Sequence, residues 1–168
     1  QYEQFQKYFE LLAEWNEKMN LTAITDESGV ALKHFADSLS LLNFVDIPQN
    51  STLADVGTGA GFPGVVLKIA RPDIKLTLID SLNKRLVFLG EVCAQLGIEA
   101  ELIHSRAEDG ARDEKLRESF DFVASRAVAR MNVSKKSPRM PGGMMRSSRS
   151  AHSVRRNRSS SCPPRTNA

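Results

Sequence analysis

Residues 55–64, which read DVGTGAGFPG, decide the fold of this chain. The apolar run TLADV at residues 52–56 leads into them and predicts a short strand, and VVLKIAR at residues 65–71 predicts a helix. Glycine allows positive φ angles in the turn between them, and its missing side chain lets a ligand approach the backbone. A strand that enters a helix through such a turn is typical of the nucleotide site of a doubly wound α/β sheet.

The order of the glycines narrows the class of ligand. From Gly57 the chain reads GTGAGF, so Phe62 stands where the dinucleotide fingerprint GxGxxG has its third glycine. The phosphate-loop pattern GxxxxGK[ST] does not fit either. A GxGxG turn opened by an acid, Asp55, is instead similar to the first motif of the S-adenosylmethionine-dependent methyltransferases, whose ligand carries a sulfonium cation and no phosphate. The alternative is a glycine-rich turn that binds nothing.

A second acid supports a nucleoside ligand. IKLTLID at residues 74–80 predicts a second strand that ends in Asp80. A carboxylate at the end of the second strand is placed to accept the two ribose hydroxyls of an adenosine. The alternative role for Asp80 is to cap the helix predicted at residues 83–96. The residue pattern alone therefore predicts that Gly59 and Asp80 bind the adenosyl ligand.

The rest of the ordered pattern alternates between helices and strands. Helices are predicted at residues 1–19, from Thr25 or Asp26 to about 44, and at 112–118, with strands at 98–104 and 120–125. This order predicts a Rossmann-like α/β fold with a parallel sheet behind an N-terminal helical cap. Ligands of such sheets bind at the carboxyl ends of strands, where Ala107 and Glu108 (expected in a loop) and Arg126 also fall.

Two polar residues of the second helix, His34 and Asp37, lie three positions apart and can share a face. A surface or inter-helix hydrogen bond is the simpler interpretation of this pair. The stripe Phe5, Phe9, Leu12, Trp15 and Met19 on the first helix is interpreted as core rather than as a nucleic-acid platform.

Composition predicts one domain of 168 residues, of which 41% are hydrophobic. No apolar run is long enough to span a membrane, and the amphipathic N-terminal residues do not resemble a secretory signal. Cys93 and Cys162 lack metal-site spacing, so we expect no metal site. These features predict a reduced, monomeric, cytoplasmic protein without a membrane partner.

The net charge of +3 conceals a split along the chain. Residues 1–133 hold 14 Lys and Arg against 20 Asp and Glu, whereas residues 134–168 hold nine Lys and Arg and no acid. We therefore divide the chain into a cap at 1–50, a core at 51–133 and a basic Ser/Arg-rich tail at 134–168 that we expect to be disordered. Such a tail can bind RNA through phosphates. A reading-frame error or a truncated gene, which would leave the sheet incomplete at its C-terminal side, is the interpretation we favour.

Six motifs taken together resemble one family. They are NLTAI at 20–24, HFADSL at 34–39, DVGTGAGFPG at 55–64, IDSLNKR at 79–85, SRAE at 105–108 and SRAVA at 125–129. The family is the bacterial guanine-N7 methyltransferases of small-subunit ribosomal RNA, also called glucose-inhibited division protein B. The resemblance covers residues 1 to about 133. It implies methyl transfer from S-adenosylmethionine to N7 of one guanine of 16S rRNA or of the small ribosomal subunit, with cofactor residues Gly57, Phe62, Ala107, Glu108 and Arg126.

The chemistry of guanine N7 agrees with what the sequence lacks. N7 has an in-plane lone pair, so an enzyme for it needs alignment and electrostatic support rather than a base. The [DNS]PP[YFW] motif of exocyclic-amine methyltransferases and the Pro-Cys nucleophile of carbon-5 enzymes are both absent. Arg126 is the candidate catalytic residue because a guanidinium suits guanine or phosphate. The alternative for Arg126 is a salt bridge to Asp80 or Glu108.

Three alternative functions remain. An acidic core is unusual for an RNA-binding enzyme, so a methyltransferase for a small molecule or a protein is one alternative. An inactive truncated or frameshifted family member is the second, and a non-catalytic RNA-binding protein that uses its basic tail is the third.

Overall fold

The computed structural model describes residues 1–110, 112–113, 116, 119–127 and 130–135. Residues Gln1–Ser137 form one compact unit, apart from Pro138–Ala168. The predicted tail lies outside the described residues except for its first two positions, and the helix predicted at 112–118 is described only in part.

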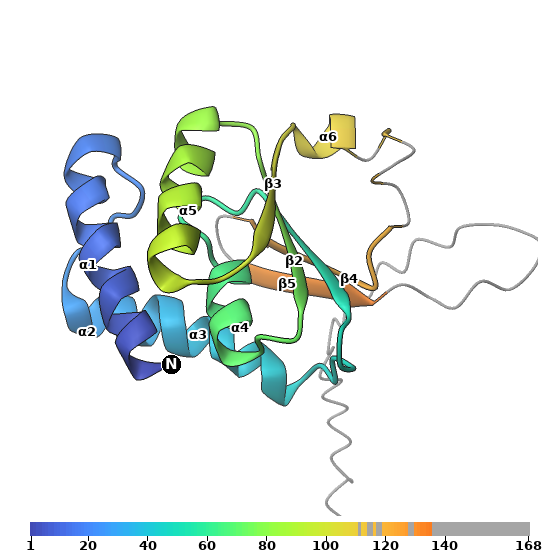
Figure 1. Ribbon diagram of the computed structural model, residues 1–168, viewed down its shortest axis with the longest axis horizontal. Helices are drawn as coiled ribbons and strands as arrows, with labels where there is room; N and C mark the ends of the chain where they lie inside the picture. Colours follow the sequence, from blue (N-terminus) through green and yellow to red (C-terminus); the bar gives the residue numbers. More distant parts are fainter. Residues whose placement is uncertain (111, 114–115, 117–118, 128–129, 136–168) are drawn as a thin grey trace, which may run out of the picture. The chain divides into compact units, whose positions relative to one another are not determined.

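A five-stranded sheet forms the centre of this unit, with the strand order β3-β2-β1-β4-β5 (Figure 1). Its strands are β1 (Thr52–Val56), β2 (Lys75–Asp80), β3 (Ala100–His104), β4 (Phe122–Ala127) and β5 (Arg130–Lys135). The first four strands are parallel, which confirms the predicted α/β class, and β5 pairs antiparallel with β4. Since β1 lies between β2 and β4, the carboxyl ends of these three strands are neighbours.

The helices are α1 (Tyr2–Met19), α2 (Glu27–Val30), η1 (Ala31–Ala36), α3 (Asp37–Ser40), η2 (Leu41–Asn43), α4 (Gly64–Ala70), α5 (Asn83–Leu96) and α6 (Ala107–Gly110). The consecutive elements from α2 to η2 make up the predicted second helix. Asp26 is its N-cap, because the Asp26 carboxylate accepts a hydrogen bond of 2.7 Å from the Gly29 amide. The π-helical turn η1 in its middle is a rare widening that is frequent at functional sites.

One hydrophobic core joins the helical cap to the sheet. Helix α1 packs against α4 and α5, which themselves lie on the sheet (Figure 1). Leu12 is 1% exposed, and Phe5, Phe9 and Trp15 pack against the core, so the interpretation of the aromatic stripe as core is confirmed. Tyr8, which lies outside that stripe, is fully buried as well. The cap is therefore part of the same folding unit as the glycine turn.

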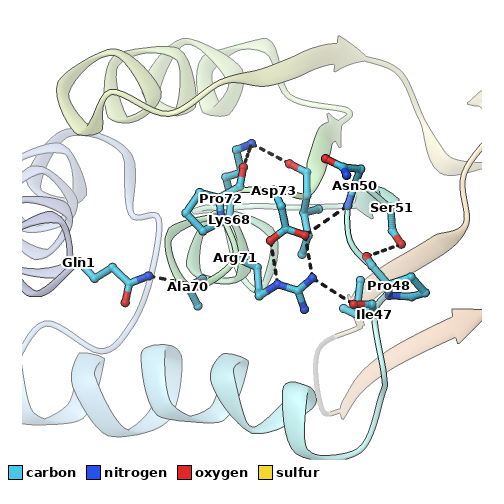
Figure 2. A network of polar contacts seen from close by, with 11 residues as sticks. Gln1, Ile47, Pro48, Asn50, Ser51, Lys68, Ala70, Arg71, Pro72 and Asp73 are labelled. Carbon is cyan, nitrogen blue, oxygen red and sulfur yellow. Dashed lines mark hydrogen bonds and ion pairs between the residues drawn. The ribbon is translucent and has the colours of Figure 1, made fainter.

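A polar network stabilises the loops before β1 and β2, at the amino ends of these strands (Figure 2). Arg71 donates to both carboxylate oxygens of Asp73, at 2.8 and 2.7 Å, and to the Ile47 carbonyl at 3.1 Å. The hydrogen bonds from Arg71 lower the pKa of Asp73 to about 2. The same carboxylate accepts from the Asn50 amide at 3.3 Å. The network thus ties the end of the cap to this edge of the sheet, opposite the carboxyl ends.

Within the part of the chain that the structure describes, no helix combines the length and the apolar character that crossing a membrane requires.

Candidate functional site

The turn after β1 leaves open space above its backbone. Gly57 and Gly59 have φ angles of 69° and 61°, in the left-handed region that favours glycine. Among the described residues, a Cβ added at Gly57 would meet no atom within 4 Å, and one at Gly59 would meet only the Gly57 carbonyl oxygen, at 3.9 Å. The absence of side chains here keeps this space free, so a ligand can lie directly on the turn.

Asp55, the first residue of the motif, stabilises the turn by hydrogen bonds from the protein interior. Its side chain is fully buried, and Oδ2 accepts from the Thr58 hydroxyl at 2.7 Å and from the Gly64 amide at 2.9 Å. A Cβ at Gly64 would lie 2.7 Å from this oxygen, because the Asp55 carboxylate occupies that space. Only glycine therefore fits at the last position of the motif. Burial raises the pKa of Asp55 to about 6. Asp55 therefore shapes the turn from the protein interior.

Asp80, at the end of β2, holds the same turn from the other side. Its Oδ2 accepts from the Gly59 amide at 2.9 Å, and Oδ1 accepts from the Leu82 amide at 2.9 Å. Arg85 approaches Oδ2 at 3.5 Å. Leu82 is the N-cap residue of α5, so Asp80 also contacts the start of this helix through the Leu82 amide. Asp80 fixes the position of Gly59 relative to β2.

A hollow of about 580 Å³ opens at the carboxyl ends of the strands. It lies where β1, β2, β3 and β4 end, and its described lining consists of Val56, Gly57, Ser81, Ser105, Arg106, Ala107, Ser125 and Arg126. Three of the predicted site residues, Gly57, Ala107 and Arg126, thus share one concave surface. Ala107 begins the short helix α6, so the expectation of a loop at this position is wrong.

Arg126 is held by the helical cap. Its Nη1 donates to His34 Nδ1 at 3.0 Å, and its Nη2 donates to the Lys33 carbonyl at 3.2 Å and lies 3.9 Å from Asp37 Oδ2. Among the described side chains, the ion partner of Arg126 is Asp37, whereas the carboxylate of Asp80 is engaged by the turn and by Arg85. A contact between cap and core positions the guanidinium beside the hollow.

Phe62 lies beneath this contact. Its ring stacks on the His34 imidazole with centroids 4.5 Å apart and 17° between the planes, and the Arg126 guanidinium carbon lies 5.9 Å from its centroid. Tyr8 of α1 completes the support, because its ring packs against Phe62 and its hydroxyl donates to the Ala60 carbonyl. Aromatic packing from the cap thus fixes the far end of the glycine turn.

The structure brings most of the predicted site residues together. Gly57, Ala107 and Arg126 line the hollow, Asp80 binds Gly59, and Phe62 lies under Arg126. Glu108 belongs to α6, and its side chain lies outside the described part. Sequence reasoning missed three contributors, which are His34 as the partner of Arg126, Thr22 as the partner of His34, and Tyr8. The spacing of His34 and Asp37 was the available signal, since both contact Arg126.

Comparison with known proteins shows the family of this chain. The family model described as "GidB: rRNA small subunit methyltransferase G" matches residues 1–147. The chain belongs to the GidB family. One relative, named ribosomal RNA small subunit methyltransferase G, from Thermoanaerobacter sp., is 58% identical over 132 residues, which are 78% of this chain and 55% of that protein. A protein of the same name from Exiguobacterium sibiricum is 54% identical over 134 residues, 79% of this chain and 56% of the relative. This GidB chain spans about half the length of the curated relatives it matches.

Solved structures support the fold of this GidB chain. A crystal structure of a mutant of MtNAS matches with a TM-score of 0.50 and 14% sequence identity, over 76% of this chain and 50% of that chain. At such low identity the likeness extends to the fold and no further.

Proposed function

We propose that this protein binds S-adenosylmethionine at the glycine turn and transfers its methyl group to N7 of a guanine in 16S rRNA. The observation that carries the proposal is the meeting of separate GidB-family motifs around one guanidinium. Arg126 of SRAVA contacts His34 of HFADSL and lies over Phe62 of the glycine motif. The relatives that share these motifs are named as methyltransferases of small-subunit ribosomal RNA.

The residues present fit the adenosyl cofactor. The side-chain-free backbone of Gly57 and Gly59 offers close approach, and a Cβ at Gly59 would fill the space that the cofactor needs. We assign the ribose hydroxyls to Asp80, which lies beside the turn at the end of β2. Its carboxylate is buried and accepts from two backbone amides, so a ribose hydroxyl would replace the long 3.5 Å contact with Arg85. Ala107 and Glu108 follow β3, and Ala107 lines the hollow.

Methyl transfer to N7 requires alignment and electrostatic support. S-adenosylmethionine supplies a methyl group made electrophilic by the attached sulfonium, and guanine N7 has a free lone pair. Arg126 is placed to donate hydrogen bonds to guanine O6 or to a backbone phosphate, which would orient N7 toward the methyl group. Its side chain is 28% exposed, so the guanidinium is accessible from the hollow while the cap restrains it.

The partner implied by this function is 16S rRNA, free or within the small ribosomal subunit. We propose that the protein acts in the cytoplasm. We propose that the protein acts as a monomer, since one chain supplies the turn, Asp80 and Arg126 together.

The test is methyl transfer by the full chain from labelled S-adenosylmethionine to 16S rRNA and to small ribosomal subunits that lack the modification. The expected product is N7-methylguanine at a single position, mapped by selective chain cleavage at the modified base. Arg126→Ala should retain its thermal melt and lose the transfer, whereas Glu101→Gln, on the edge strand β3, should behave as the wild type. Cofactor binding without transfer to either RNA substrate would contradict the assignment.

A further inference from the structure

We propose that His34 is the positioning residue for Arg126, and that it acts as a neutral imidazole with its proton on Nε2. The effect of His34 on binding and transfer rests on the proposed function. The protonation state of His34 and its contact with Arg126 follow from the contacts of the cap with β4.

The hydrogen-bond partners of His34 assign the tautomer. A guanidinium only donates, so His34 Nδ1, which lies 3.0 Å from Arg126 Nη1, must accept and carries no proton. The proton of the neutral ring is then on Nε2, which lies 2.9 Å from Thr22 Oγ1. The same Oγ1 accepts from the Ile24 amide at 3.1 Å. Thr22 is thereby oriented as an acceptor for the imidazole N–H.

The ring of His34 has little freedom to leave this position. It is 7% exposed and stacks on Phe62 at 4.5 Å, and its two nitrogens are both engaged. The π-helical turn η1 carries His34 and also presents the Lys33 carbonyl to Arg126 Nη2. The guanidinium is therefore held on two adjacent nitrogens by consecutive residues of one turn, which restrains its plane as well as its position.

Protonation of His34 would undo this arrangement. An imidazolium has a donor on Nδ1, so it would lose the hydrogen bond from Arg126 and place two cations in contact. In the part of the chain that the structure describes, the charged groups that face the ring are Arg126 from β4, Asp37 from α3 and Lys33 from η1; Thr22 and Phe62 are uncharged. Burial, and then the charge of Arg126, lower the pKa of His34, which agrees with a neutral ring.

The direct test is the ¹⁵N NMR spectrum of the imidazoles in the full chain, which has three histidines. His34→Phe assigns the signal of His34 by its disappearance. The expected result is an unprotonated Nδ1, a protonated Nε2 and a pKa below the ordinary value of 6.5. A protonated Nδ1 or a raised pKa would overturn the proposal, whatever the protein is found to bind.

Arg126 lines the hollow and is also one of the cofactor residues that the family resemblance implies, so the functional test is a double-mutant cycle on affinity for S-adenosylmethionine. If His34 acts through Arg126, His34→Phe and Arg126→Ala should each weaken binding about tenfold, and the double variant should be no weaker than Arg126→Ala alone. Leu32→Ala, an exposed change in the same helical turn, is the matched control and should bind as the wild type. Additive losses in the double variant would overturn the positioning role.

The pH profile separates positioning from a purely structural role. Affinity of the wild type should fall as the pH drops through the pKa of His34, and in His34→Phe this fall should be absent. A wild-type chain that is folded and binds no S-adenosylmethionine would contradict the proposed function, whereas the NMR result would still decide the tautomer and the contact with Arg126.

Discussion

The Tyr8 hydroxyl of the cap helix donates a hydrogen bond to the Ala60 carbonyl at the centre of the glycine turn. Both residues are buried, and burial raises the pKa of Tyr8 well above its ordinary value, so the phenol stays protonated and remains a donor. The helix that begins the chain thus determines the conformation of a turn some fifty residues later.

Tyr8→Phe should reveal this link. The substitution leaves the Ala60 carbonyl buried without its donor, which should lower the free energy of unfolding by about 1–2 kcal/mol and weaken S-adenosylmethionine binding. Denaturant unfolding and calorimetry measure the two effects. Tyr2→Phe, at a side chain that is 80% exposed, is the control and should change neither. Unchanged stability of Tyr8→Phe would show that the turn keeps its conformation without this hydrogen bond.

Gly59 and Gly97 are a matched pair of positions for testing whether a ligand lies on the glycine turn. Both have a φ of 61°, and a Cβ at either would meet no atom of the described residues closer than 3.9 Å, but of the two only Gly59 lies in the turn. Alanine at either position should cost about 1–2 kcal/mol of stability through left-handed strain. Only Gly59→Ala should also abolish S-adenosylmethionine binding, because its methyl group occupies the ligand space. Equal binding by the two variants, measured by calorimetry, would argue against a ligand on the turn.

Asp55 should make stability depend on pH. Its pKa rises from 3.8 to about 6 on folding, so its favourable contribution is complete below 3.8 and disappears as the pH rises through 6. The wild type should therefore lose about 1 kcal/mol relative to Asp55→Asn between about pH 5 and about pH 7. Thermal melts of both proteins across this range measure the difference. Parallel profiles would mean that Asp55 titrates at its ordinary pKa.

Asp80→Asn tests the carboxylate at the end of β2. Two backbone amides donate to Asp80, so an asparagine must turn its own N–H₂ toward one of them. We expect affinity for S-adenosylhomocysteine to fall about tenfold to a hundredfold, since hydrogen bonds to a charged acceptor contribute about 1.5–3 kcal/mol. Glu101→Gln on β3 is the control acid and should bind as the wild type. A binding constant that Asp80→Asn leaves unchanged would remove Asp80 from the site.

The central part of the site could be predicted because its signals are local. The strand, the glycine turn and the helix follow one another in sequence, and Asp80 ends a strand whose apolar pattern is clear. β5 was not predicted, because its pairing with β4 depends on a tertiary arrangement rather than on an apolar alternation of its own. The start of α4 at Gly64 rather than Val65 is a difference of one residue.

The role of His34 could not be predicted for the same physical reason. Its partner Arg126 is 92 positions away, and only the packing of the cap against the sheet brings the two side chains together. From sequence, His34 and Asp37 indicated an ordinary hydrogen bond between helices, whereas both contact the guanidinium beside the hollow.

Whether the glycine turn binds a cofactor is decided by calorimetric titration of the full chain with S-adenosylmethionine, accompanied by a thermal melt. We expect saturable binding at one site per chain, with a melting temperature that rises as the ligand concentration exceeds its dissociation constant. A chain that melts cooperatively, gives no saturable heat and shows no shift in melting temperature would contradict the assignment of the glycine turn as a cofactor site.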